Sequence, residues 1–275
     1  MKFALNHMVA PRLDHRAFFD LAHKLGVADV EIRNDLPGVA LADGTPAAEV
    51  GKEAKARGLN VLTINALQRF NLWDDARAKE AELMIAQCAE SGAEALVLCP
   101  VNDVAYKPSA SERRAELIKA LNGLKPMLSA AGVRGYVEPL GFPECSLRYK
   151  EEAVEAIEAV GGGDVFRIVH DTFHHFVAGE IKTFPRMTGL VHVSGVIDPA
   201  ATAATVRDPH RVLIDASDRI GNVEQLRALL AGGYAGPASF EPFAASVHAS
   251  ASIEADLHQI LTELSLSTTV KVERV

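Results

Sequence analysis

Short apolar strand patterns alternate with amphipathic helical patterns along almost the whole chain, and this alternation restricts the possible folds more than any other feature. Strands are predicted at residues 2–8, 29–33, 60–65 and 94–99, and then in four stretches that end near residues 138, 171, 192 and 241. Helices are predicted at 14–25, 47–57, 74–91, 111–131, 150–160, 179–185, 223–230 and 253–264. Residues 199–221 and 267–275 carry neither pattern. Eight strand-helix units in 275 residues predict an α/β fold, a single-domain (β/α)8 TIM barrel over residues 1–275.

An open, doubly wound sheet would show a similar alternation of strands and helices. That fold requires a phosphate-binding loop of the Gly-x-Gly-x-x-Gly type between an early strand and its helix. The glycine run Gly161-Gly162-Gly163 precedes a strand instead of opening a helix, and we interpret it as a flexible turn. The closed barrel therefore explains the pattern better.

Charge and cysteine content argue against several classes of partner and location. The net charge is −8, and the lysines and arginines are scattered, which argues against nucleic acid as a partner. The odd set of cysteines, Cys88, Cys99 and Cys145, has no paired spacing, so we expect buried free thiols in a reducing, cytoplasmic location. No apolar run approaches the roughly 18 residues that span a bilayer, and no signal-peptide pattern is present, so no membrane partner is expected.

Four predicted strands end in side chains that bind metal ions. Glu138, Asp171, His192 and Glu241 each lie at or within two residues of a strand's C-terminal end. In a (β/α)8 barrel these ends meet at one mouth, where the chemistry takes place. One such residue alone is more often part of an ion pair or of the core than a metal ligand, but carboxylates gathered at one mouth would repel each other without a cation between them. The donor set suits one divalent ion, Mn, Zn, Co or Mg.

At these residues the chain resembles the xylose-isomerase-like barrels, the sugar isomerase and epimerase superfamily, and within it the inosose isomerases. The resemblance covers nearly the whole chain and is carried by Ile64-Asn65-Ala66-Leu67, Phe70-Asn71, Val137-Glu138-Pro139-Leu140-Gly141-Phe142-Pro143-Glu144-Cys145, Asp171-Thr172-Phe173-His174 and Ser239-Phe240-Glu241-Pro242-Phe243. It implies that Glu138, Asp171, His192 and Glu241 hold the metal ion, and that His174 and Arg211 bind substrate oxygens.

The activity that the resemblance implies is a metal-dependent isomerisation of a small, neutral polyol or keto-sugar, with 2-keto-myo-inositol (inosose) as substrate. Glu138 and Glu241 would flank the substrate, so that one carboxylate removes a proton and the other returns it. The second ring nitrogen of His192 needs an acceptor, which the sequence does not identify. No glycine-rich loop follows the last two strands, so a phosphorylated substrate is not expected.

Other functions are compatible with the same residues. A ketose C3-epimerase or an inosose dehydratase would share the first proton abstraction. An endonuclease IV-like DNA-repair enzyme would need a basic face and a multinuclear zinc cluster, which this acidic chain does not suggest. A sugar-binding or regulatory protein with a retained site is a non-enzymatic alternative, which the presence of both glutamates disfavours. A homo-oligomer is compatible with any of them.

Overall fold

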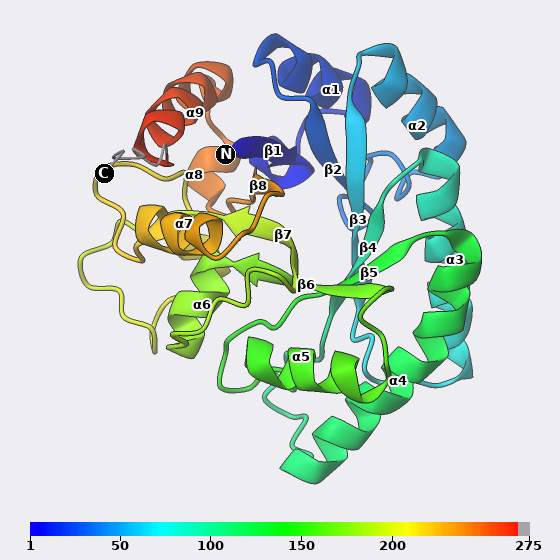
Figure 1. Cartoon of the computed structure of the whole chain (residues 1–275). Coiled ribbons are helices and arrows are strands. Elements are labelled where there is room, and N and C mark those ends of the chain that lie inside the picture. The colour runs from blue at the N-terminus through cyan, green and yellow to red at the C-terminus, as the bar shows by residue number, and fades with distance from the viewer. Residues whose placement is uncertain (269–275) are drawn as a thin grey trace, which may run out of the picture.

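The computed structural model describes residues 1–268 and shows a closed barrel of eight parallel strands that follow one another in chain order. Figure 1 shows the strands gathered at the centre with the helices around them. The predicted single-domain (β/α)8 barrel is therefore confirmed. The strands are β1 Lys2–Asn6, β2 Asp29–Arg33, β3 Asn60–Gln68, β4 Ala95–Cys99, β5 Arg134–Val137, β6 Phe166–Asp171, β7 Thr188–Val193 and β8 Pro237–Phe240.

Most helices lie where the amphipathic pattern predicts them. They are α1 His15–Lys24, α2 Ala47–Ala56, α3 Asp75–Ser91, α4 Ala110–Ala131, α5 Lys150–Ala159, α6 Thr172–Ala178, α7 Asn222–Ala231, α8 Ala245–His248 and α9 Ile253–Thr268. Two short 3-10 helices, η1 His7–Val9 and η2 Asp208–His210, add to them. The irregular stretch predicted between β7 and α7 contains η2 and otherwise only loops and an isolated bridge. Residues 269–275 of the unassigned C-terminal stretch lie outside the described part of the chain.

The predicted helix at residues 179–185 is wrong. The helix α6 begins directly after β6, because the side chain of Asp171 accepts hydrogen bonds from the backbone N–H groups of Phe173 and His174 and caps the helix there. Gly179 adopts a left-handed conformation with φ 68° and ends α6 where the prediction began a helix. His174 consequently belongs to a helix.

The barrel closes through parallel pairing of the first strand with the last. Lys2 pairs with Pro237, and Leu5 with Phe240. Alternate strand residues then divide between two apolar clusters. Side chains such as Leu5, Leu96 and Val191 pack outward against the helices, and a smaller cluster that includes Val97 and Tyr136 fills the barrel interior.

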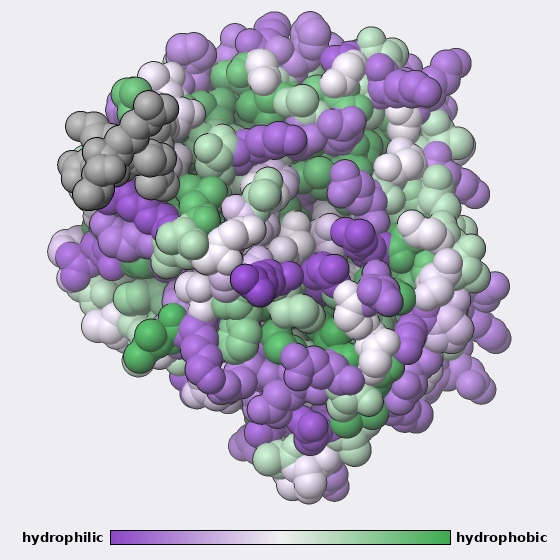
Figure 2. All heavy atoms as spheres, viewed as in Figure 1, coloured by the Kyte–Doolittle hydropathy of each residue, from purple (hydrophilic) through white to green (hydrophobic). Residues whose placement is uncertain are grey.

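One face of the molecule is largely polar at its surface (Figure 2). Figure 2 shows hydrophilic residues spread across the whole viewed face, with smaller apolar areas between them. Among residues 1–268, no helix combines the length and the apolar character that crossing a bilayer requires. The helices thus bury one side against the barrel and leave the other to solvent.

Candidate metal centre

The structure brings Glu138, Asp171, His192 and Glu241 together at the C-terminal mouth of the barrel. Each residue offers one ligand atom, and these atoms all lie within 4.8 Å of one another. Asp171 is the last residue of β6, His192 lies one residue before the end of β7, and Glu138 and Glu241 directly follow β5 and β8. All four are buried. Their positions at strand ends are what makes the convergence possible, because the strands are parallel and adjacent.

His192 lies at the centre of the cluster and is fully buried. Its Nδ1 is 2.8 Å from Glu138 Oε1 and 3.3 Å from Glu241 Oε2. Its other nitrogen, Nε2, is 3.1 Å from Oε2 of Glu31 on β2. Burial lowers the pKa of His192, but the charges of the surrounding glutamates outweigh burial and raise this pKa well above its usual value. Glu31 is thus the acceptor that the sequence left unidentified.

The two carboxylate oxygens of Asp171 have different partners. Oδ1 caps α6, as described above, and Oδ2 accepts a hydrogen bond from Arg211 Nη2 at 2.6 Å. Burial acts to raise the pKa of Asp171, but the Arg211 charge and its neighbours hold it at about 2. The residue is therefore an anion that is oriented by a helix on one side and by an arginine on the other.

Two arginines hold Glu241, one at each carboxylate oxygen. Arg33 Nη1 is 2.8 Å from Oε1, and Arg211 Nη2 is 2.9 Å from Oε2. Both guanidinium groups also lie over the Phe243 ring, at 5.6 Å for Arg33 and 4.6 Å for Arg211. Burial nevertheless raises the pKa of Glu241 to about 7, because it outweighs the neighbouring positive charges.

The cluster fits a divalent ion. With metal-ligand bonds of about 2.1 Å, opposite ligands of an octahedral ion lie about 4.2 Å apart. The donor atoms here span at most 4.8 Å, so a small inward movement would give them a common centre. Three carboxylates and one imidazole are the donors that Zn, Mn, Co and Mg accept.

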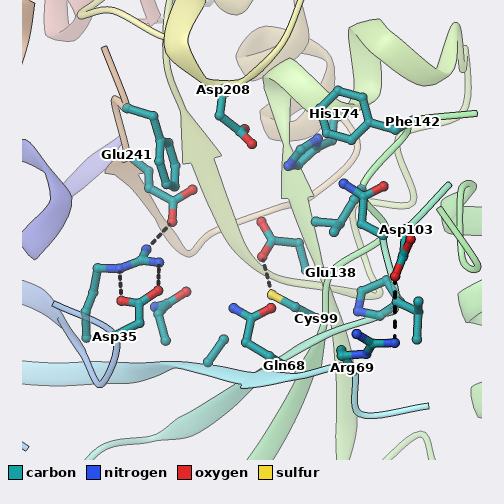
Figure 3. A pocket seen from close by; sticks show the side chains of 18 of the residues that line it. Asp35, Gln68, Arg69, Cys99, Asp103, Glu138, Phe142, His174, Asp208 and Glu241 are labelled. Atoms are coloured by element: carbon teal, nitrogen blue, oxygen red, sulfur yellow. Dashed lines mark hydrogen bonds and ion pairs between the residues drawn. The ribbon is translucent and has the colours of Figure 1, made fainter. Parts of the chain in front are cut away.

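A cavity of about 350 Å³ lies over the cluster. Figure 3 shows Glu138 and Glu241 with their carboxylates directed into it and His174 on its border. Arg211, predicted with His174 to bind substrate, also lines the cavity, although it lies in the long connection between β7 and α7. The isolated bridge between Gly195 and Val212 fixes that connection next to the barrel.

Sequence reasoning missed three residues near the cluster besides the role of Glu31. Arg33 contacts Glu241, and Cys99 Sγ lies 3.4 Å from Glu138 Oε2. Asn6 Nδ2 lies within 3.4 Å of both Glu31 and Glu241. A signal existed for β2, because strict alternation in Asp29-Val-Glu-Ile-Arg33 predicts charged side chains on one face, and Glu31 and Arg33 do point inward.

The closed barrel and the buried donor cluster at its mouth place the chain among the (β/α)8 barrels with a candidate metal centre at the C-terminal rim. More specifically, the chain belongs to the xylose isomerase-like TIM barrel family, whose model matches residues 19–263. It is thus a member of the sugar isomerase and epimerase superfamily.

Comparison with individual proteins agrees with this assignment. A xylose isomerase domain-containing protein from Salmonella typhimurium LT2 is 32% identical, with a TM-score of 0.87 over 97% of both chains. The chain is 27% identical to the inosose isomerase of Bacillus velezensis over 177 residues, a region that spans 62% of this chain and 62% of that relative. The IolI protein, solved with a bound zinc atom, has the same fold, with a TM-score of 0.84 at 20% identity over 98% of both chains.

Proposed function

We propose that the protein is a divalent-metal-dependent isomerase that acts on a neutral polyol or keto-sugar, with 2-keto-myo-inositol as substrate. The observation that carries this proposal is the buried cluster of Glu138, Asp171, His192 and Glu241 with two of its glutamates on one cavity. The similarity to an inosose isomerase supports the choice of substrate.

The four clustered residues would hold the ion. A bound divalent ion would supply positive charge to two adjacent substrate oxygens, which makes the neighbouring C–H bond more acidic. The proton itself would be transferred by the carboxylates. Glu138 and Glu241 both face the cavity, so one can take the proton from the substrate carbon and the other can return a proton to the adjacent carbon.

The substrate oxygens would be bound by His174 and Arg211. Both side chains are almost completely buried beside the cavity, and Arg211 is already oriented by Ser194 Oγ, which accepts from its Nε at 3.0 Å. A group held this firmly loses little entropy when it binds a ligand. Together they would fix which two oxygens face the metal.

The charges around the cavity favour a substrate without a phosphate group. Carboxylates on the cavity wall outnumber the arginines, and each arginine is paired with a carboxylate. The carboxylates are Asp35, Asp103, Glu138, Asp208 and Glu241, and the arginines are Arg33, Arg69 and Arg211. A dianion would have to break these pairs, whereas hydroxyl groups can donate to the carboxylates and accept from the arginines.

The Glu241→Gln variant tests the proposal. It should bind a divalent ion and keep the fold, but lose turnover of 2-keto-myo-inositol by orders of magnitude, because an amide cannot accept the proton. Glu263→Gln, an exposed change on α9, serves as the matched control. Near-wild-type turnover by Glu241→Gln would remove its catalytic role. Deuterium wash-in from solvent should accompany turnover, because proton transfer exchanges with water and a hydride shift does not.

Ketose C3-epimerisation is the second candidate. A D-psicose 3-epimerase from Clostridium cellulolyticum H10 has the same fold, with a TM-score of 0.76 at 15% identity over 98% of this chain and 100% of that one. Both reactions would begin with the same proton abstraction. Product analysis with 2-keto-myo-inositol and with a ketohexose separates them.

A further inference from the structure

Glu31 lies inside the barrel on β2, which two strands, β8 and β1, separate from the β7 strand of His192. Both side chains are completely buried, and 161 positions separate them in the sequence. Glu31 does not line the cavity, so it does not reach a substrate there. Its carboxylate nevertheless contacts the imidazole of His192, which is one of the four candidate ligands.

Besides His192, the Glu31 carboxylate accepts hydrogen bonds from three side chains of the described residues. Oε2 accepts from Thr63 Oγ1 at 2.6 Å and from Asn65 Nδ2 at 2.7 Å, and Oε1 accepts from Asn6 Nδ2 at 3.3 Å. Asn6 and Thr63 are the direct neighbours of Glu31 on the two adjacent strands. The barrel register therefore fixes the carboxylate in place before any ion binds.

This arrangement determines which nitrogen of His192 is available to a metal ion. An ionised carboxylate only accepts hydrogen bonds, and both ring nitrogens face one: Nε2 faces Glu31 at 3.1 Å, and Nδ1 faces Glu138 and Glu241 at 2.8 and 3.3 Å. Glu138 and Glu241 line the cavity and are themselves candidate ligands, whereas Glu31 is not, so an ion can replace the proton on Nδ1 while Nε2 keeps its N–H toward Glu31. Nδ1 is therefore directed toward the same point as the carboxylate ligands.

We propose that Glu31 is a positioning residue of the metal centre: it holds His192 with the proton on Nε2, so that Nδ1 is the atom that binds the ion. The inference rests on the metal site of the proposed function but not on the identity of the substrate. Carboxylates that orient a metal-binding imidazole in this way contribute about 10- to 100-fold to metal affinity.

The first test is the affinity of the stripped protein for Zn²⁺, measured by isothermal titration calorimetry. Glu31→Gln should bind one Zn²⁺ about 10- to 100-fold more weakly than the wild type, because an amide can present either a donor or an acceptor to Nε2. Thr63→Val is the matched control, since it removes one donor to Glu31 but keeps the carboxylate next to His192. The Zn²⁺ affinity of Thr63→Val should be closer to that of the wild type than to that of Glu31→Gln. Equal affinities of wild type and Glu31→Gln would overturn the proposal.

The second test needs only the wild-type chain and holds even where Glu31→Gln fails to fold. In ¹⁵N-histidine NMR spectra of the Zn²⁺-loaded protein, His192 should show a metal-bound Nδ1 and a protonated Nε2. A metal-bound Nε2 would refute the inference. Zn²⁺ binding through Nδ1 without turnover of 2-keto-myo-inositol would instead count against the proposed substrate and leave the role of Glu31 intact.

Discussion

Gly141 follows β5 closely and touches the helix that carries His174, so its substitution should disturb the substrate side of the site. Its φ is +71°, in the left-handed region. A Cβ at this position would lie 2.2 Å from the backbone oxygen of His174 and 3.1 Å from the backbone nitrogen of Ala178. These are atoms of α6 itself, which cannot turn away as the end of a long side chain can. Gly141→Ala should therefore shift α6.

The size of the effect has two parts. A left-handed conformation costs a residue with a Cβ about 1–2 kcal/mol, and an extra group in a packed region costs about 1–3 kcal/mol. We therefore expect Gly141→Ala to lower the free energy of unfolding by about 2–5 kcal/mol. Gly132→Ala measures the cost of the left-handed conformation alone, because Gly132 has φ +68° and nothing lies within 4 Å of the position that a Cβ would take.

Urea unfolding followed by circular dichroism measures both variants under the same conditions. The loss for Gly141→Ala should exceed that for Gly132→Ala by about 1–3 kcal/mol. The Michaelis constant for 2-keto-myo-inositol should also rise in Gly141→Ala only, since His174 moves with α6. Equal losses of stability in the two variants would show that α6 is not packed against Gly141 as described.

Two further predictions concern buried titratable groups away from the cavity. Burial lowers the pKa of His7 from its ordinary value of 6.5 to about 4. Between these two pH values the imidazole binds a proton in the unfolded chain but not in the folded one. The free energy of unfolding should therefore fall by about 3 kcal/mol as the pH is lowered through this range. Urea unfolding at several pH values should show a shallower pH dependence for His7→Gln than for the wild type. The same pH dependence in both proteins would exclude the effect. Lys150 pairs with Glu180 at 2.7 Å in a nearly buried site, so Lys150→Met should lower the free energy of unfolding by about 3–5 kcal/mol, because the Glu180 carboxylate loses the lysine charge. Adding Glu180→Gln should restore most of that loss in the same urea assay, and no restoration would contradict the pairing.

The positions of the candidate ligands were predictable because they depend on local signals. A strand pattern shows where each strand ends, and in a parallel barrel every C-terminal end lies at the same mouth. The convergence of Glu138, Asp171, His192 and Glu241 follows from those two facts. The beginning of α6 was less predictable, because it depends on the side chain of Asp171 turning back to cap the helix.

The sequence by itself thus determined the barrel, its strand ends and the four donors, since periodicity and residue type suffice for each. Only the tertiary structure decided what orients those donors. Glu31 reaches His192 across the barrel, and Arg33 reaches Glu241 although 208 positions separate them in the sequence. Such contacts are set by how neighbouring strands are shifted and tilted when the barrel closes, and no local pattern of residues records that arrangement.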